Sequence, residues 1–181
     1  MIRKFIFFFM AFVSLISTAW ADTGASLTIP VITKDPEHLH GYRASVWYQP
    51  QSWIWQHLHI FFDASFGHWW VSSNVPYREV NIFAVAPVFR IFTKQYALFS
   101  TPISPFADLS IGLSYLSKTR LDSQNLGMHF AFQDQVGIGV VLGKEQRLSI
   151  SISALHYSNG SMCKKNAGIT VPLLVNVGYR F

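Results

Sequence analysis

The sequence has little charge, a single cysteine and, beyond its first residues, no long apolar run. Charged residues make up 13% of its 181 residues, about half the usual share. Cys163 stands alone, so no disulfide can form within the chain. The longest apolar run after residue 21, from Ile82 to Phe89, has eight residues, whereas a membrane-spanning helix needs about 18. These absences exclude a disulfide-stapled domain and a helix that spans a membrane after residue 21.

The residues that are present are unusually apolar. Hydrophobic residues make up 50% of the chain and aromatic residues 16%. A high apolar content without long apolar runs indicates strands that face lipid, because only helices and closed barrels satisfy the backbone inside a bilayer. The formal net charge is +5, of which Arg3 and Lys4 lie at the start of the chain. The remaining charge is small and scattered, so we expect no nucleic-acid partner.

The first residues resemble a secretory signal peptide. Arg3 and Lys4 precede an apolar run from Phe5 to Ile16, and small residues occupy the two positions of Ala19-Trp20-Ala21 that a signal peptidase reads. We therefore expect a signal peptide at residues 1–21, cleavage before Asp22 and one domain over residues 22–181.

Segments of about ten residues alternate between apolar and polar side chains, which is typical of a transmembrane barrel. In the clearest segment, Ala107 to Tyr115, apolar residues at odd positions alternate with Asp108, Ser110, Gly112 and Ser114. The fold prediction is all-β, an eight-stranded antiparallel transmembrane β-barrel. We expect the strands near residues 25–33, 41–49, 56–71, 79–93, 104–117, 128–142, 147–158 and 170–181.

An even number of strands places both chain ends on the periplasmic side of a bacterial outer membrane. The short connections at 49–51 and 143–146 then become periplasmic turns. The longer connections at 72–78, 118–127 and 159–169 become external loops. Side chains fill the interior of an eight-stranded barrel, so we expect no wide aqueous pore.

Two polar residues continue the lipid-facing side of the seventh strand. The outward positions from Leu148 to Ala154 are apolar and are followed by His156 and Ser158, at the external end. Residues two apart on one face are about 6.6 Å apart along a strand, so an imidazole can reach a hydroxyl there. Such a pair forms a base-activated nucleophile. The alternative is two interfacial polar residues with no catalytic role.

Asp134 is a second polar residue among outward apolar ones, on the sixth strand. A carboxylate facing lipid is unfavourable unless it has a partner or lies near the interface. If the turn between these strands centres on Glu145, Asp134 lies directly opposite His156. A cluster of Asp134, His156 and Ser158 that faces lipid implies a lipid substrate.

The other histidines give weaker signals. His38 and His40, or His57 and His59, share a face if they lie on strands, but no third ligand accompanies either pair. We therefore predict no metal site and no cofactor.

In this order and on this barrel, the motifs resemble those of the outer-membrane lipid A 3-O-deacylases, the PagL family. His156-Tyr157-Ser158-Asn159 matches the catalytic motif of the family, and Asn166-Ala167-Gly168-Ile169 matches the segment that follows it. Phe132-Gln133-Asp134 matches a phenylalanine-x-aspartate element. Two further similar stretches are Ala86-Pro87-Val88-Phe89 and Asp122-Ser123-Gln124-Asn125-Leu126-Gly127.

The resemblance implies a serine esterase that removes the acyl chain at the 3-position of lipid A, the lipid part of lipopolysaccharide, in the outer leaflet. It implies that Ser158 is the nucleophile and His156 the general base, and that Asn159, with nearby backbone N–H groups, stabilises the oxyanion. The partners are then lipid A and other outer-membrane lipids. A phospholipase and a catalytically inactive structural barrel are alternatives, and a homodimer stays open.

Thr170 departs from the family pattern. The best-known members have a glutamate at this position, which orients the histidine, whereas threonine carries no charge. Three outcomes are open: a Ser-His dyad, replacement of the glutamate by Asp134, or an inactive barrel. Counted back from Phe181, Thr170 faces the lumen unless a bulge intervenes, and its hydroxyl could at most hold the imidazole through a neutral hydrogen bond.

Overall fold

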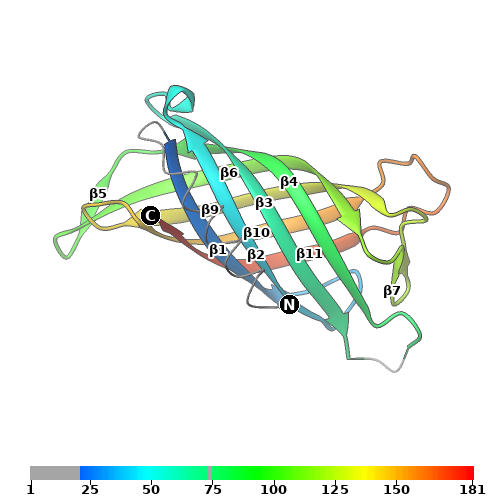
Figure 1. Cartoon of the computed structure of the whole chain (residues 1–181). Coiled ribbons are helices and arrows are strands. Elements are labelled where there is room, and N and C mark those ends of the chain that lie inside the picture. Colours follow the sequence, from blue (N-terminus) through cyan, green and yellow to red (C-terminus); the bar gives the residue numbers. More distant parts are fainter. Residues whose placement is uncertain (1–20, 73–74) are drawn as a thin grey trace, which may run out of the picture.

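A computed structural model describes residues 21–72 and 75–181 and shows a closed antiparallel barrel (Figure 1). The expected signal peptide lies outside the described residues except for Ala21, which begins the first strand. The predicted fold class and the eight predicted strands are confirmed. The long strands are β1 (Ala21–Ile32), β2 (Leu39–Pro50), β3 (Leu58–Val71), β4 (Glu79–Phe92), β6 (Thr101–Leu116), β9 (Phe130–Leu142), β10 (Leu148–Ser158) and β11 (Ile169–Arg180).

Each long strand pairs with the long strands next to it in sequence, including β4 with β6, and one further pairing, between β1 and β11, closes the barrel. A path across paired residues, begun at Leu148 on β10, passes round all eight strands and returns to β10 at Ser158, ten residues further on. Such a stagger requires strongly tilted strands, roughly 35–45° from the barrel axis. The tilt lets one lipid-facing row climb from the periplasmic end to the external end.

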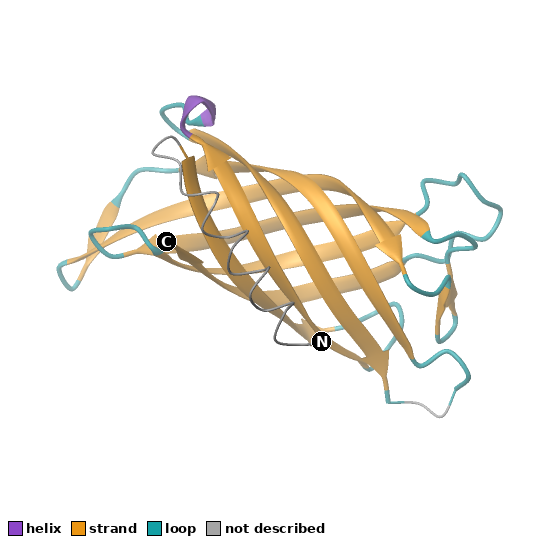
Figure 2. Ribbon diagram, in the orientation of Figure 1, coloured by secondary structure: helices purple, strands orange, loops and turns teal. Residues whose placement is uncertain are grey.

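Short elements lie at the two ends of the barrel (Figure 2). At the periplasmic end, the helical turn η1 (Gln51–Trp53) follows β2, and β5 (Tyr96–Leu98) pairs with the start of β6. At the external end, β7 (Arg120–Leu121) and β8 (Gln124–Asn125) form a small hairpin within the loop between β6 and β9.

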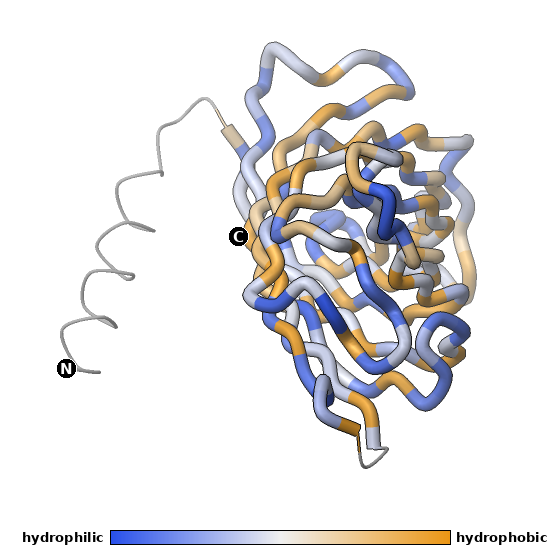
Figure 3. Tube along the Cα trace, turned by 90° about the vertical axis from the view of Figure 1, so that its right-hand side faces the viewer, coloured by the Kyte–Doolittle hydropathy of each residue, from blue (hydrophilic) through white to orange (hydrophobic). Residues whose placement is uncertain are grey.

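Apolar and polar residues alternate along the strands, as Figure 3 shows. Outward residues such as Val85, Ile111 and Ile138 are 57%, 59% and 60% exposed. Their inward neighbours are small, polar or buried. This is the arrangement that a barrel wall in contact with lipid requires.

No helix within residues 21–72 and 75–181 is long and apolar enough to cross a membrane.

Ion pairs and hydrogen bonds fill the middle of the lumen. Arg43 forms a buried salt bridge with Asp63. The guanidinium of Arg90 donates two hydrogen bonds of 2.8 Å to the two carboxylate oxygens of Asp108. Charged groups inside a barrel are stable when they are paired in this way.

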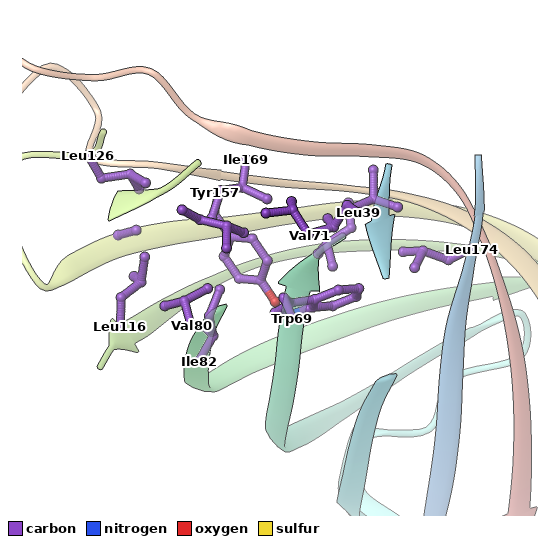
Figure 4. Packing of buried hydrophobic residues seen from close by; sticks show 14 residues of the cluster. Leu39, Trp69, Val71, Val80, Ile82, Leu116, Leu126, Tyr157, Ile169 and Leu174 are labelled. Atoms are coloured by element: carbon purple, nitrogen blue, oxygen red, sulfur yellow. The ribbon is translucent and has the colours of Figure 1, made fainter. Parts of the chain in front are cut away.

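The external end of the lumen is closed by an apolar cluster (Figure 4). Trp69 and Tyr157 are its largest members, and both are almost completely buried. In Figure 4 the hydroxyl of Tyr157 points toward Trp69. The cluster also contains Leu39, Val71, Val80, Ile82, Leu116, Leu121, Leu126, Ala131, Leu155, Ile169, Val171 and Leu174. It forms a rigid wall directly behind the external half of β10.

Candidate active site

The external end of β10 presents His156 and Ser158 on the outer face of the barrel. Both are partly buried, whereas Leu155 and Tyr157 beside them point inward and are fully buried. Strand alternation explains this arrangement. The inward pair packs into the apolar cluster, so the backbone that carries His156 and Ser158 is fixed from the inside.

Asp134, on β9, pairs directly with His156 on β10, as the hairpin register predicted. The same register places Phe132 opposite Ser158. The turn between β9 and β10 centres on Glu145, because Leu142 pairs with Leu148.

Thr170 flanks His156 on the other side, on β11, and it faces outward. A bulge lies between Val171 and Leu174, both of which point inward, and Pro172 lies within it. Proline cannot donate a ladder hydrogen bond, so it is tolerated at a bulge. The extra residue turns Thr170 from the lumen-facing side to the side of His156, which is the exception that the sequence left open.

The bulge brings the two side chains into contact. His156 Nδ1 and Thr170 Oγ1 are 2.9 Å apart. In the tautomer with hydrogen on Nδ1, the imidazole donates to the threonine oxygen and leaves the lone pair of Nε2 available as a base. No hydrogen bond or ion pair joins Asp134 to His156 among the described residues.

Gly168 packs against the His156 ring. A Cβ atom placed on Gly168 would lie 2.6 Å from His156 Cε1 and 3.1 Å from Nε2. Only glycine therefore fits beside the imidazole in this orientation. The sequence motif contained Gly168, but nothing in the pattern showed that its missing side chain matters.

The side chain of Asn159 does not lie on the outer face beside Ser158, where an oxyanion donor would be expected. It points inward and is fully buried, and its Nδ2 donates to the carbonyl oxygens of Leu126 at 2.6 Å and Lys165 at 2.7 Å. Because both hydrogens of this amide are used, the side chain has no donor left for an oxyanion. Asn159 instead ties the end of β10 to two external loops.

Strand periodicity gave no signal that Asn166 is a candidate site residue, because it lies on a loop. Its Oδ1 accepts the backbone N–H of Asn159 at 2.9 Å, while its own position is exposed. With the oxygen committed, Nδ2 is the part of this amide that can donate to a substrate.

The chain turns sharply directly after the candidate nucleophile. Met162 N–H donates to Asn159 O at 3.1 Å, and the two residues between them have positive φ, 61° at Gly160 and 65° at Ser161. This is the geometry of a type I′ turn. The N–H groups of Gly160 and Ser161 have no backbone acceptor in the described part of the chain.

An apolar groove of about 290 Å³ runs along the outer wall beside His156. It is lined by Asp134, His156 and Thr170 and by apolar residues of β6, β9 and β10. Ala154, the outward residue that precedes His156, leaves space between larger neighbours. The other lining residues are Leu109, Ser110, Ile111, Gln135, Val136 and Leu155.

The basic side chains of the external loops differ in their surroundings. Lys118 pairs with Glu79 at 3.1 Å, and the guanidinium of Arg120 lies 4.4 Å from the centre of the Tyr77 ring. Lys164 and Lys165 are exposed on the loop that follows Ser158.

Within the described residues, no three His, Cys, Asp or Glu side chains gather in a way that could hold a metal ion. Of the histidines considered for metal, His40 lies beside Trp70 instead, with ring centres 6.1 Å apart.

Comparison with known proteins identifies the family of the chain. A sequence model of the lipid A 3-O-deacylase (PagL) family matches residues 39–180, which is most of the chain. The chain belongs to this family. It is an outer-membrane lipid A deacylase, and thus an ester hydrolase.

Individual relatives agree with the family. Lipid A deacylase PagL of Pseudomonas aeruginosa is 32% identical over 127 residues, which cover 68% of each chain. Lipid A deacylase PagL of Bordetella bronchiseptica is 23% identical over 117 residues, 65% of this chain and 60% of that one. The crystal structure of the outer-membrane enzyme PagL superposes with a TM-score of 0.65 at 23% identity, over 86% of this chain and 98% of the other, and supports the same fold.

Proposed function

We propose that Ser158 and His156 hydrolyse the ester-linked acyl chain at the 3-position of lipid A. Ser158 Oγ attacks the ester carbonyl while His156 Nε2 takes its proton. The same imidazole then returns the proton to the departing sugar oxygen. Water, activated by His156, releases the fatty acid from Ser158 in a second step.

The orientation of His156 and Ser158 is the observation that supports the proposed hydrolysis most strongly. His156 and Ser158 lie on the lipid-facing side of the barrel, at its external end, with Thr170 holding Nδ1 and Gly168 leaving room for the ring. Lipid A occupies the outer leaflet at this level. The apolar groove beside His156 would hold the acyl chain that is cut.

The oxyanion would be held by groups other than the Asn159 side chain. The turn after Ser158 offers the N–H groups of Gly160 and Ser161, and Asn166 Nδ2 lies on the same loop. Each such donor is typically worth about 3 kcal/mol in the transition state. Asn159 contributes indirectly, because it ties this loop to the barrel.

Mass spectrometry of lipid A from cells that express the protein tests the proposal. We expect the loss of one hydroxyacyl chain, and no loss with Ser158→Ala at the same amount of folded, heat-modifiable barrel. Ser161→Ala, on the turn beside the site, is the matched control and should retain most activity because only its backbone is needed. Full activity of Ser158→Ala would refute the mechanism, and unchanged lipid A with released phospholipid fatty acid would indicate a phospholipase.

A further inference from the structure

A second apolar groove on the outer wall is centred on the strands opposite β10, and its edge at Phe130 on β9 lies near the candidate active site. Its volume is about 940 Å³, and it covers the outer face of β1 to β4 and reaches β6 and β9. β3 is four strands away from β10 in either direction round the barrel. Three outward alanines, Ala25, Ala44 and Ala64, lie among larger residues such as Phe66 and Phe83, and so create the depression.

Four ring side chains lie on the same outer face at the external end of these strands. We call His40, Tyr42, His68 and Trp70 the rim cluster. The ring of His68 lies 5.3 Å from that of Trp70 and 6.0 Å from that of Tyr42, and His40 lies 6.1 Å from Trp70 on its other side. His68 Nδ1–H donates to Asn81 Oδ1 at 2.7 Å, which fixes the ring and leaves Nε2 for another partner.

The strand register joins the rim cluster to the groove. Tyr42 pairs with His68, and Ala44 pairs with Phe66, two residues further along the same face. His68 pairs in turn with Asn81 on β4, and Phe66 with Phe83. The rim cluster therefore forms the external border of the groove.

This combination fits an amphiphile whose head lies above its chains. The groove matches acyl chains, and its position places them inside the bilayer. Indole and phenol rings suit the membrane interface, where they contact both apolar and polar groups. A ring held by a hydrogen bond, with its Nε2 lone pair beside Trp70, suits a hydroxyl group of a sugar, which can donate to it. The alternative is that these rings are ordinary aromatic residues of the membrane interface. That alternative does not explain why one imidazole is held by a hydrogen bond or why a groove lies beside the rings.

We infer that this wall binds a second molecule of lipid A, which is held and not cleaved. The outer leaflet supplies this phosphorylated, multiply acylated sugar at the level of the rim cluster. The four serines that line the groove, Ser26, Ser45, Ser65 and Ser114, belong to the inward-facing side of the wall. Ser26 Oγ and Ser45 Oγ bond to each other at 2.6 Å, and Ser114 Oγ donates to Ala131 O at 2.8 Å. Because these serine hydroxyls face the lumen, they cannot act as nucleophiles on a lipid bound at the outer face.

The test is to count lipid A molecules bound to the folded Ser158→Ala barrel by native mass spectrometry. We expect His68→Leu/Trp70→Leu to bind one molecule fewer than its Ser158→Ala parent. Ala44→Leu/Ala64→Leu, which fills the groove, should have the same effect. Trp55→Leu, an exposed aromatic at the periplasmic end, and Ala107→Leu, an outward alanine outside both grooves, are the matched controls and should leave the number unchanged.

An unchanged number in the rim-cluster and groove variants would overturn the inference, as would displacement of the second lipid A by equimolar phosphatidylglycerol. The inference and the proposed mechanism fail separately. Cleavage of lipid A by the Ser158→Ala barrel would refute the proposed mechanism. The number of lipid A molecules bound could still be compared between the variants, so the inference would still be tested. With Ser158 intact, the His68→Leu/Trp70→Leu enzyme should hydrolyse a short neutral ester at the wild-type rate.

Discussion

Replacing Asp134 by asparagine should reduce turnover far more than removing the hydroxyl of Thr170. In the proposed mechanism, His156 becomes a cation when it takes the proton of Ser158. Thr170 contacts Nδ1 at 2.9 Å, but it is neutral. Asp134 pairs with His156 across the strands and lines the same groove, so it is the carboxylate placed to stabilise that cation.

The magnitudes follow from this geometry. Directly opposed residues on neighbouring strands have Cβ atoms about 5 Å apart. A charge about 5.5 Å from the imidazolium, at an effective dielectric constant of about 20, is worth roughly 3 kcal/mol. That corresponds to about 10²-fold in rate. A neutral hydrogen bond contributes about 1 kcal/mol, or roughly 5-fold, so Thr170→Ala should be the milder change.

Turnover of purified lipid A at matched amounts of folded barrel provides the assay. Asp134→Asn should lower kcat about 10²-fold, as estimated from the charge lost. Thr170→Glu should equal or exceed the wild type, because it restores the charged residue of the family at the position that contacts Nδ1. Asp122→Asn, which removes a carboxylate from an external loop, is the control. Wild-type turnover in Asp134→Asn, together with a severe loss in Thr170→Ala, would reverse the assignment and make Thr170 the functional partner.

Three further variants test other parts of the site. Gly168→Ala should lower kcat about 10-fold or more with little change in KM, since the added methyl displaces the His156 ring; unaltered kcat would contradict the close packing. Asn159→Leu should lower activity and speed proteolysis of the external loops, because two carbonyls lose their donor; an intact cleavage pattern would argue against the tie. Lys164 and Lys165 are exposed on the loop after Ser158, where their ammonium groups can bind the phosphates of lipid A. Lys164→Ala/Lys165→Ala should therefore weaken lipid A turnover more than hydrolysis of a short neutral ester, and equal effects would exclude this phosphate contact.

Strand alternation made most of the barrel predictable. A period of two residues places side chains on opposite faces, so apolar outward positions could be read along every long strand. The short turn between β9 and β10 also made the pairing of Asp134 with His156 predictable, because a tight hairpin fixes its own register. The same alternation would have placed Asn159 inward, next to an outward Ser158. The family motif suggested an oxyanion role instead, whereas the buried amide donates both of its hydrogens to loop carbonyls.

The features of the site that could not be predicted from the sequence depend on irregular backbone. Counting along β11 fails at the bulge around Pro172, which moves Thr170 to the other face. The position of Asn166 depends on a loop that passes through two residues of positive φ. Periodicity carries no information about such a loop. The packing of Gly168 against His156 is likewise a contact between a loop and a strand, visible only after both are placed.

The apolar cluster inside the external end of the barrel links the fold to the chemistry. A hydrolase that faces lipid cannot bury its catalytic residues in a cleft, so their rigidity has to come from behind the strand. Leu155 and Tyr157 provide it, because each proposed catalytic residue on the outer face has an inward neighbour packed into the cluster. The same packing closes the external end of the lumen, so the site lies on the outer face of the barrel. A water-filled barrel of equal size would leave β10 free to move, and the geometry of a site such as this one would be lost with shifts of about 1 Å.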